Sequence, residues 1–179
     1  MTQRHAWTGL AFWLALFISG PALAGVGTGT FTAQTQVNAN CTLSTSAVAF
    51  GSYDPIGANQ TADLNSIGTI TIACVKGSAP TIGLDLGGNA SGTTRRMQNT
   101  TVAGNFLQYE LYLPSGTAPN AACSFPGTTV WGTSGGNLFD PGAAPSKNAR
   151  TYNVCGTIPA GLNPVIGNYQ DTVVATVNF

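Results

Sequence analysis

Short runs in which hydrophobic and polar residues alternate recur along most of the chain. In residues 107–113, Leu107, Tyr109 and Leu111 share one face, and polar residues separate them. This pattern is typical of an antiparallel strand with one buried face. Similar runs predict strands at residues 47–53, 67–75, 81–86, 128–131, 150–158 and 168–179. After residue 24 no long segment has uninterrupted helical spacing, so the pattern predicts an all-β sandwich or barrel.

Residues 1–24 differ from the rest of the chain. Arg4 precedes an apolar run at residues 10–18, and small residues up to Ala24 follow it. This order is typical of a secretory signal peptide, and we expect cleavage after Ala24. The apolar run is too short for a membrane-spanning helix, which needs about 20 residues. The sequence therefore predicts a soluble, exported protein.

Alternation also marks both ends of the exported part. Near its start, one face of residues 31–39 is formed by Phe31, Ala33, Thr35 and Val37. At its end, one face is formed by Val173, Ala175, Val177 and Phe179. We expect this C-terminal face to pack into the core, with Phe179 buried in it. The pattern predicts that the protein begins and ends in strands.

Composition narrows the possible function classes. Hydrophobic residues make up 43% of the chain and charged residues 7%, so it can bury a core but has no basic patch for nucleic acid. Removal of residues 1–24 takes away the single histidine, His5, and leaves five basic and six acidic side chains. Without histidine, Ser-His-Asp and Cys-His catalysis are excluded and the commonest metal ligand is missing. We expect no catalytic site, no metal, no cofactor and no nucleic-acid partner.

The cysteines of an exported chain predict two disulfides among Cys41, Cys74, Cys123 and Cys155. Three pairings are possible. We favour Cys41–Cys74 and Cys123–Cys155, because each bond joins a predicted strand or its edge to a later strand. A zinc site is the alternative, which the lack of histidine and of a Cys-x-x-Cys motif disfavours.

The charged residues have structural interpretations. A pair of carboxylates would form a glycosidase site only if the fold brought them together, and nothing in their spacing indicates this. Asp85 and Glu110 lie on the polar faces of predicted strands, and Asp54 is typical of a turn. The doublet Arg95-Arg96 is interpreted as a solvated strand edge.

A series of short motifs runs along residues 31–179. The most specific are Phe50-Gly51 and Gly167-x-Tyr169-x-Asp171-Thr172. The others are Cys41-x-Leu43, Ile72-Ala73-Cys74, Arg96-Met97, Leu107-x-Tyr109-x-Leu111-Tyr112, Trp131-Gly132 and Gly156-x-Ile158-Pro159-Ala160-Gly161. In this order and at these spacings they resemble the spore coat protein U domain family, which includes the pilins of archaic chaperone-usher pili. Two features depart from the family pattern, namely Leu162, where Gln is frequent, and the cysteine pair Cys123 and Cys155.

The resemblance implies an incomplete immunoglobulin-like β-sandwich that lacks its last strand. It implies that a periplasmic chaperone holds the subunit, that an outer-membrane usher assembles it, and that the next subunit completes it by donor-strand exchange. The chain then divides into a signal peptide (1–24), a donor-strand segment (25–39) and a pilin domain (40–179). The expected donor side chains are Phe31, Ala33, Thr35 and Val37. The expected acceptor groove and chaperone-binding strand contain Val173, Ala175, Val177 and Phe179.

These inferences favour a structural subunit of an extracellular pilus, exported through the periplasm to the cell surface. Its partners would be identical or related subunits, and the fibre would support adhesion and biofilm formation. The alternative is a monomeric exported coat or carbohydrate-binding protein whose terminal segment folds into its own sheet. Its sugar site would lie at Trp131 and the loops of residues 114–148, although Trp131 more simply predicts a core aromatic. An enzyme with paired carboxylates is the least favoured hypothesis.

Overall fold

The computed structural model describes residues 25–179, so the predicted signal peptide lies outside the described residues. Residues 37–179 form one compact unit, which contains the strands of the described chain. Residues 25–36 belong to a separate unit, where they are exposed and carry no strand. Over residues 25–179, no helix is long and apolar enough to cross a bilayer.

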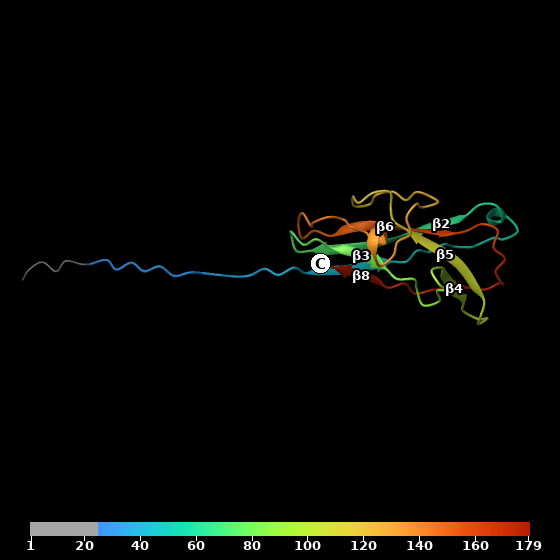
Figure 1. The fold of residues 1–179 in the computed structure, drawn as a ribbon, viewed down its shortest axis with the longest axis horizontal. Helices are drawn as coiled ribbons and strands as arrows, with labels where there is room; N and C mark the ends of the chain where they lie inside the picture. The colour runs from blue at the N-terminus through green and yellow to red at the C-terminus, as the bar shows by residue number, and fades with distance from the viewer. Residues whose placement is uncertain (1–24) are drawn as a thin grey trace, which may run out of the picture. The chain divides into compact units, whose positions relative to one another are not determined.

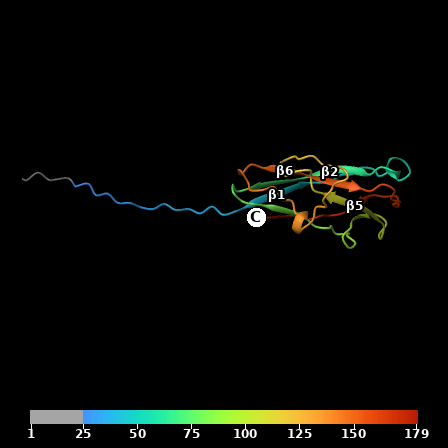
Figure 2. The ribbon, with the colours of Figure 1, turned by 45° about the horizontal axis from the view of Figure 1, so that its top comes forward.

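Residues 37–179 fold into two antiparallel sheets (Figures 1 and 2). The larger sheet has the strand order β1-β2-β6-β5-β4-β7. Its strands are β1 (Cys41–Ser46), β2 (Leu64–Cys74), β4 (Arg95–Asn99), β5 (Phe106–Tyr112), β6 (Arg150–Ile158) and β7 (Tyr169–Gln170). The smaller sheet pairs β3 (Thr81–Leu84) with β8 (Ala175–Asn178). Short 3-10 helices lie in the connections at η1 (Ala58–Gln60) and η2 (Gly135–Asn137).

Side chains from both sheets form one hydrophobic core. At its centre, Ile70 of β2 and Tyr152 of β6 are register partners, and both are fully buried. From the smaller sheet, the carbonyl oxygen of Ile82 accepts a 2.9 Å hydrogen bond from the indole nitrogen of buried Trp131. This bond satisfies the one polar atom of the indole, so the ring is buried without an unpaired donor.

The predicted all-β class is confirmed, as are the runs at residues 67–75, 81–86, 107–113 and 150–158, which the structure forms as β2, β3, β5 and β6. In β5 the faces also agree with the pattern. Leu107, Tyr109 and Leu111 are buried, and Gln108 between the first two is exposed. Alternation therefore identified strands whose apolar residues pack directly on the core.

The strand predicted at residues 47–53 is wrong, because the structure forms β1 just before it. The burial that produced the pattern is nevertheless present. Val48, Phe50 and Tyr53 pack against the core although their segment pairs with no strand of residues 25–179. Gly51, with a φ of +77°, interrupts the extended backbone at this point. The alternating pattern of this segment therefore reports side chains that face the core, although the backbone has no hydrogen-bonded strand partner.

Two other predicted strands are reduced. Within residues 128–131 the structure has one isolated bridge, between Tyr112 and Val130. The run at 168–179 splits into β7 and β8. The break occurs where the carboxylate of Asp85 accepts a hydrogen bond from the backbone nitrogen of Val174, so a side chain replaces a ladder partner.

Strand β4 was not predicted, because it begins with the polar doublet Arg95-Arg96. The expectation that this doublet is solvated is wrong for Arg95, whose side chain is fully buried. Its guanidinium pairs with Glu110 and donates hydrogen bonds to the backbone oxygens of Leu84, Asp85 and Trp131. One cation thereby joins β3, β4, β5 and the loop before η2, which is a structural role.

Candidate functional site

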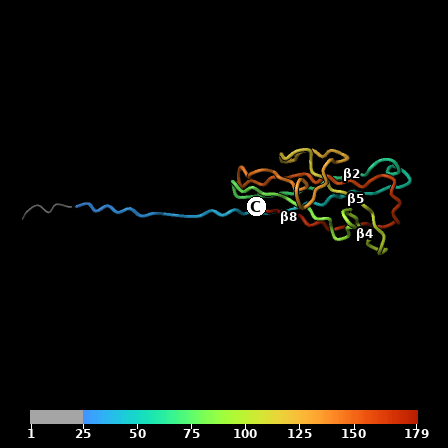
Figure 3. Tube along the Cα trace, in the orientation of Figure 1, coloured from blue at the N-terminus to red at the C-terminus, as the bar shows by residue number. Residues whose placement is uncertain are grey.

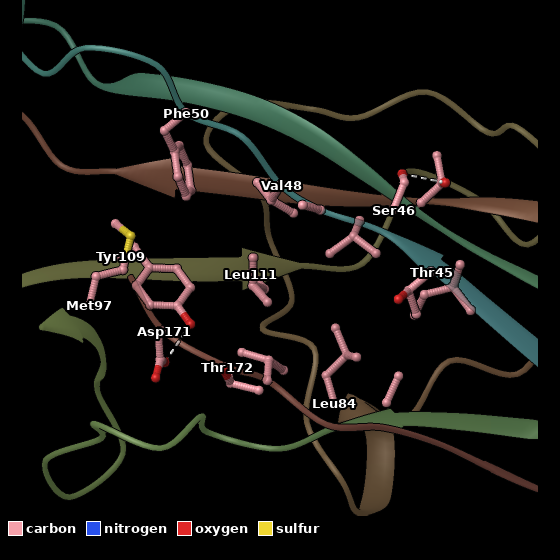
Figure 4. Close-up of a pocket in the computed structure, with 16 residues that line it drawn as sticks. Thr45, Ser46, Val48, Phe50, Leu84, Met97, Tyr109, Leu111, Asp171 and Thr172 are labelled. Carbon is pink, nitrogen blue, oxygen red and sulfur yellow. Dashed lines mark hydrogen bonds between the residues drawn. The ribbon is translucent and has the colours of Figure 1, made fainter. Parts of the chain in front are cut away.

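A groove runs between the first and the last segments of the compact unit. One wall is formed by residues 45–50 and the other by residues 171–175, with β5 beneath them (Figure 4). This part encloses about 290 Å³. Its apolar floor consists of Ile70, Leu84, Met97, Tyr109, Leu111 and Val154. These side chains belong to the core, so the groove opens the core to one side.

A second cavity of about 540 Å³ continues the first one. Its walls are residues 48–55 and 164–169, and its floor includes Leu107 and Ile158. Val48, Phe50 and Met97 line both cavities. We refer to the two together as the groove. Figure 3 shows both walls as long stretches of the trace that run along the body of the compact unit.

The backbones of both walls have an unpaired side. β1 is the outermost strand of its sheet, and residues 47–53 pair with no strand of the described chain. On the opposite wall, the carbonyl oxygens of Thr172 and Val174 accept hydrogen bonds from Gly88 and Asp85. Between them, the backbone of Val173 bonds to no described residue. An added strand would satisfy such edge groups, which otherwise depend on water.

A polar cluster holds the middle of the second wall in place. The hydroxyl of Tyr109 donates a 2.7 Å hydrogen bond to one carboxylate oxygen of Asp171, and Asn89 donates to the other at 2.9 Å. Burial, followed by the neighbouring Asp171, raises the pKa of Tyr109 well above its usual range. A Cβ at Gly87, whose φ is +79°, would meet the Asp171 carboxylate. The cluster therefore ties residue 171 to β5 and requires glycine beside it.

The predicted groove residues differ in where they lie and in how deeply they are buried. Val173 and Ala175 line the groove, and Val177 packs against the core farther along β8. Phe179 is 53% exposed, so the expectation that it is buried in the core is wrong. It follows the last residue of β8, where no described strand covers it. The chaperone-binding role of this strand stays a prediction.

The predicted donor residues are exposed and outside any strand. Phe31 has 92% of its surface exposed and Val37 has 76%. Ala33 and Thr35 are also exposed. Their insertion into a groove therefore stays a prediction.

Sequence reasoning missed the first wall of the groove. It assigned residues 47–53 to an ordinary strand, and the contribution of Met97 was hidden in the polar run of β4. The available signal was the Phe50-Gly51 pair, because a glycine after a core-facing aromatic indicates an interrupted edge.

Both disulfides have the favoured pairing. Cys41–Cys74 joins register partners at the start of β1 and the end of β2. Cys123–Cys155 attaches the loop region to β6. All four cysteines are therefore bonded, which rules out the zinc alternative.

The other candidates for chemistry have structural roles. The buried Trp131 is no surface platform, so the sugar site proposed at this residue is wrong. Asp54 caps a turn by accepting hydrogen bonds from the backbone nitrogens of Ile56 and Gly57. Within residues 25–179, no three His, Cys, Asp or Glu side chains gather into a metal-binding group.

The fold defines a class of protein, an all-β sandwich with a groove between its first and last segments. The chain belongs to the Spore Coat Protein U domain family, whose sequence profile matches residues 27–176. Protein U of Myxococcus xanthus is 31% identical to it over 178 residues, which cover 92% of each chain.

Solved structures show a similar fold. One is a chain in the crystal structure of the CsuC–CsuE chaperone–tip adhesion subunit pre-assembly complex, from the archaic chaperone-usher Csu pili of Acinetobacter baumannii. The TM-score is 0.53 at 23% sequence identity. The match covers 80% of the present chain and 40% of that chain, so it supports the fold of the compact unit.

Proposed function

We propose that this protein is a structural subunit of an extracellular chaperone-usher pilus and polymerises by donor-strand exchange. The observation that carries the proposal is the groove, which opens the core between two walls that have unpaired backbone. A strand from another molecule would cover the apolar floor and bond to both walls at once. The likeness to a chain from a pilus pre-assembly complex supports the same function.

The N-terminal segment has the pattern that such a groove needs. Phe31, Ala33, Thr35 and Val37 recur at every second residue, so an extended backbone directs all four to one side. From the first to the last of them the segment spans roughly 20 Å at 3.3 Å per residue. The groove wall at residues 45–53 is slightly longer, so the segment fits within it.

A subunit with an open groove needs protection before assembly. Unpaired edges and an exposed core favour aggregation. We therefore assign a periplasmic chaperone to the free subunit, in contact with the strand that carries Val173, Ala175, Val177 and Phe179. An outer-membrane usher would then exchange the chaperone for the next subunit. The signal peptide at residues 1–24 would direct the chain to this route.

At the cell surface, the product would be a fibre of identical or related subunits. The contact is head to tail, because donor segment and groove are different surfaces, and such a contact does not close on itself. We propose that the fibre supports adhesion and biofilm formation, and that the protein is not an enzyme.

The second candidate is a monomeric exported coat protein, which the family description and the likeness to Protein U favour. In this case residues 25–39 fold back into the chain's own groove. They directly precede β1, which borders the groove, so a turn at residues 38–40 suffices. The segment would then run antiparallel to β1, as the first strand of a β-hairpin does.

Two matched substitutions separate these functions in the full chain, produced together with its chaperone. Ala33→Asp places a charge on the face that enters the groove, and Gln34→Asp places the same charge on the opposite face. For a pilus subunit, Ala33→Asp abolishes the ladder of heat-resistant multimers in detergent, and Gln34→Asp keeps it. Deletion of residues 25–36 should leave soluble chaperone complexes that do not polymerise. A parent chain that is monomeric without chaperone contradicts the pilus function and supports the coat protein.

A further inference from the structure

Exposed apolar side chains gather at one end of the groove. Ile56 is 89% exposed, Ile166 94%, Val165 46% and Val102 43%. They belong to three loops that follow β4, precede η1 and precede β7. We call these four residues the loop patch. Large apolar side chains exposed together are unusual on a soluble domain and mark interaction surfaces.

Hydrogen bonds hold two of these loops together. The side chain of Asn99 donates a 3.2 Å hydrogen bond to the carbonyl oxygen of Ile166 and accepts one of 3.0 Å from the backbone nitrogen of Val102. Asn99 itself is 3% exposed. The third loop borders the same cavity as the loop before β7, because Pro55, Val165 and Ile166 all line it. Hydrogen bonds therefore fix two of the three loops of the loop patch, and the patch borders the groove.

The opposite end of the domain is where the donor segment joins it. There β1 begins, β2 ends, and the backbone nitrogen of Val75 donates to the carbonyl oxygen of Asn40. The loops of residues 75–80 and 140–149 lie at the same end, since Gly77 and Ala144 are hydrogen-bonded. We call this the β1 end.

The chain length restricts where a neighbouring copy lies during donor-strand exchange, so this inference rests on the proposed function. Residues 38–40 separate the last donor side chain, Val37, from Cys41 and span roughly 10 Å when extended. The neighbour's β1 end must therefore lie beside one end of the groove. If it lay at the acceptor's own β1 end, it would occupy the place where the acceptor's residues 37–40 leave toward the next groove. The remaining position is at the loop patch.

We propose that the loop patch is a second contact between consecutive subunits, covered by the β1 end of the copy that donates its strand. The charges of the two surfaces are complementary. The loop-patch end carries Asp54, which precedes Pro55 of the groove wall, and Asp63, which precedes the first residue of β2. At the β1 end, Lys76, Lys147 and Arg150 outnumber Asp140. Apolar burial and opposite charges then fix the orientation of each subunit on the next one.

Zero-length cross-linking of fibres from the full chain tests the contact. A carbodiimide joins a lysine amine to a carboxylate only where the two touch. Lys76 follows β2 and Asp63 precedes it, so the strand holds them roughly 33 Å apart within one chain. Lys147 lies at the same end as Lys76, and Asp54 lies at the same end as Asp63. Any bond from either lysine to either aspartate is therefore intermolecular. We expect mass spectrometry to find such bonds in fibres and not in chaperone-bound subunits.

The double variant Ile56→Ser, Ile166→Ser tests the apolar part. Because both side chains are exposed, the subunit should fold and retain its multimer ladder, with the yield of these cross-links lower by about tenfold. Ile67→Ser is the matched control, since Ile67 is 49% exposed but lies on β2, and it should keep the parental yield. Fibres without these cross-links, or a double variant with parental yield, overturn the contact and leave the proposed function intact. Absence of fibres from the parent overturns both.

Discussion

The two sides of the sandwich are built from the same alternating pattern and differ in how they are closed. On the closed side, β6 lies between β2 and β5, and Ile72, Tyr152 and Trp131 are fully buried. On the open side, Val173 and Ala175 face the groove and are half-buried. Burial on the closed side is complete because each strand has a neighbour. The open side has the apolar floor of a core without the strand that would cover it.

This difference separates the stability of the subunit from its assembly. The closed side supplies buried area whether or not a partner is present. On the open side, the proposed donor strand would add buried area only when it binds, and a ligand that binds only the folded state increases stability with its concentration. Substitutions on the closed side should therefore change folding of the free subunit, whereas those on the open side should change strand binding.

The largest expected effect on folding is at Arg95. Arg95→Ala leaves Glu110 without its cation and removes the donors from three backbone carbonyls, so we expect a loss of about 3–5 kcal/mol in the free energy of unfolding. Arg96→Ala is the matched control. Arg96 lies over the ring of Phe106 and donates one hydrogen bond to Asn89, so its loss should cost about 1 kcal/mol. Urea unfolding of both variants measures the difference. Equal losses would contradict the role of Arg95 in joining β3, β4, β5 and the loop before η2.

The second effect is on strand binding. Val173→Asp places a carboxylate in the groove, where a bound strand would desolvate it, so the affinity for a peptide of residues 25–39 should fall by about a hundredfold. Val174→Asp is the control, because Val174 is 55% exposed and its backbone bonds toward β3. Titration of the subunit that lacks residues 25–36 measures both affinities. Equal affinities would mean that the peptide binds outside the groove.

The comparison also shows what the sequence allowed us to predict. Strands with an alternating apolar face were recognisable, since Leu107 and Tyr109 alternate with polar residues and are buried as expected. The open side misled the same method, because Val48 and Phe50 face the core from a segment without a partner. The pattern records burial, and hydrogen-bonded pairing depends on residues far away in the chain. The groove was predicted through family motifs, whereas its first wall was found only in the structure.

Charge was the other source of error. A doublet of arginines normally predicts solvent exposure, since burying a cation is costly. Arg95 is buried because Glu110 on the neighbouring strand and three carbonyl oxygens converge on it. These partners come from positions 84 to 131 and have no local sequence signature. Such a site becomes predictable only when the strand order is known.

The third effect depends on pH and concerns the polar cluster at the groove. Because the pKa of Tyr109 is raised in the folded protein, the neutral phenol is favoured there. Stability from this group is complete below the unfolded pKa of about 10 and is lost as the pH rises above it, by up to about 1.4 kcal/mol per pH unit. Tyr109→Phe should cost about 1 kcal/mol at neutral pH, since it removes the hydrogen bond to Asp171.

The pH dependence of stability tests whether the pKa of Tyr109 is raised in the folded protein. Above pH 10, Tyr109→Phe should lose stability less steeply than the parent, because one phenol no longer titrates. Burial also raises the pKa of Tyr112, which is less buried and has no part in the cluster, so Tyr112→Phe should change the slope less. Urea unfolding at pH 8 to 11 measures the slopes. Parallel curves for parent and Tyr109→Phe would show that the pKa of Tyr109 is not raised in the folded protein.

The smallest effect on the free subunit is expected at Phe179, where the sequence suggested a buried anchor. Because 53% of its surface is exposed, Phe179→Ala should lower the free energy of unfolding by less than about 1 kcal/mol. Val177→Ala is the comparison, since Val177 packs against the core and its loss should cost about 1–2 kcal/mol. If a chaperone covers the end of β8, the order of the two variants is the opposite for chaperone binding. Phe179→Ala should then reduce the yield of chaperone complex more than Val177→Ala does, because a half-exposed aromatic ring gains the most area when a partner binds. Equal yields for the two variants would place the chaperone contact elsewhere on the open side.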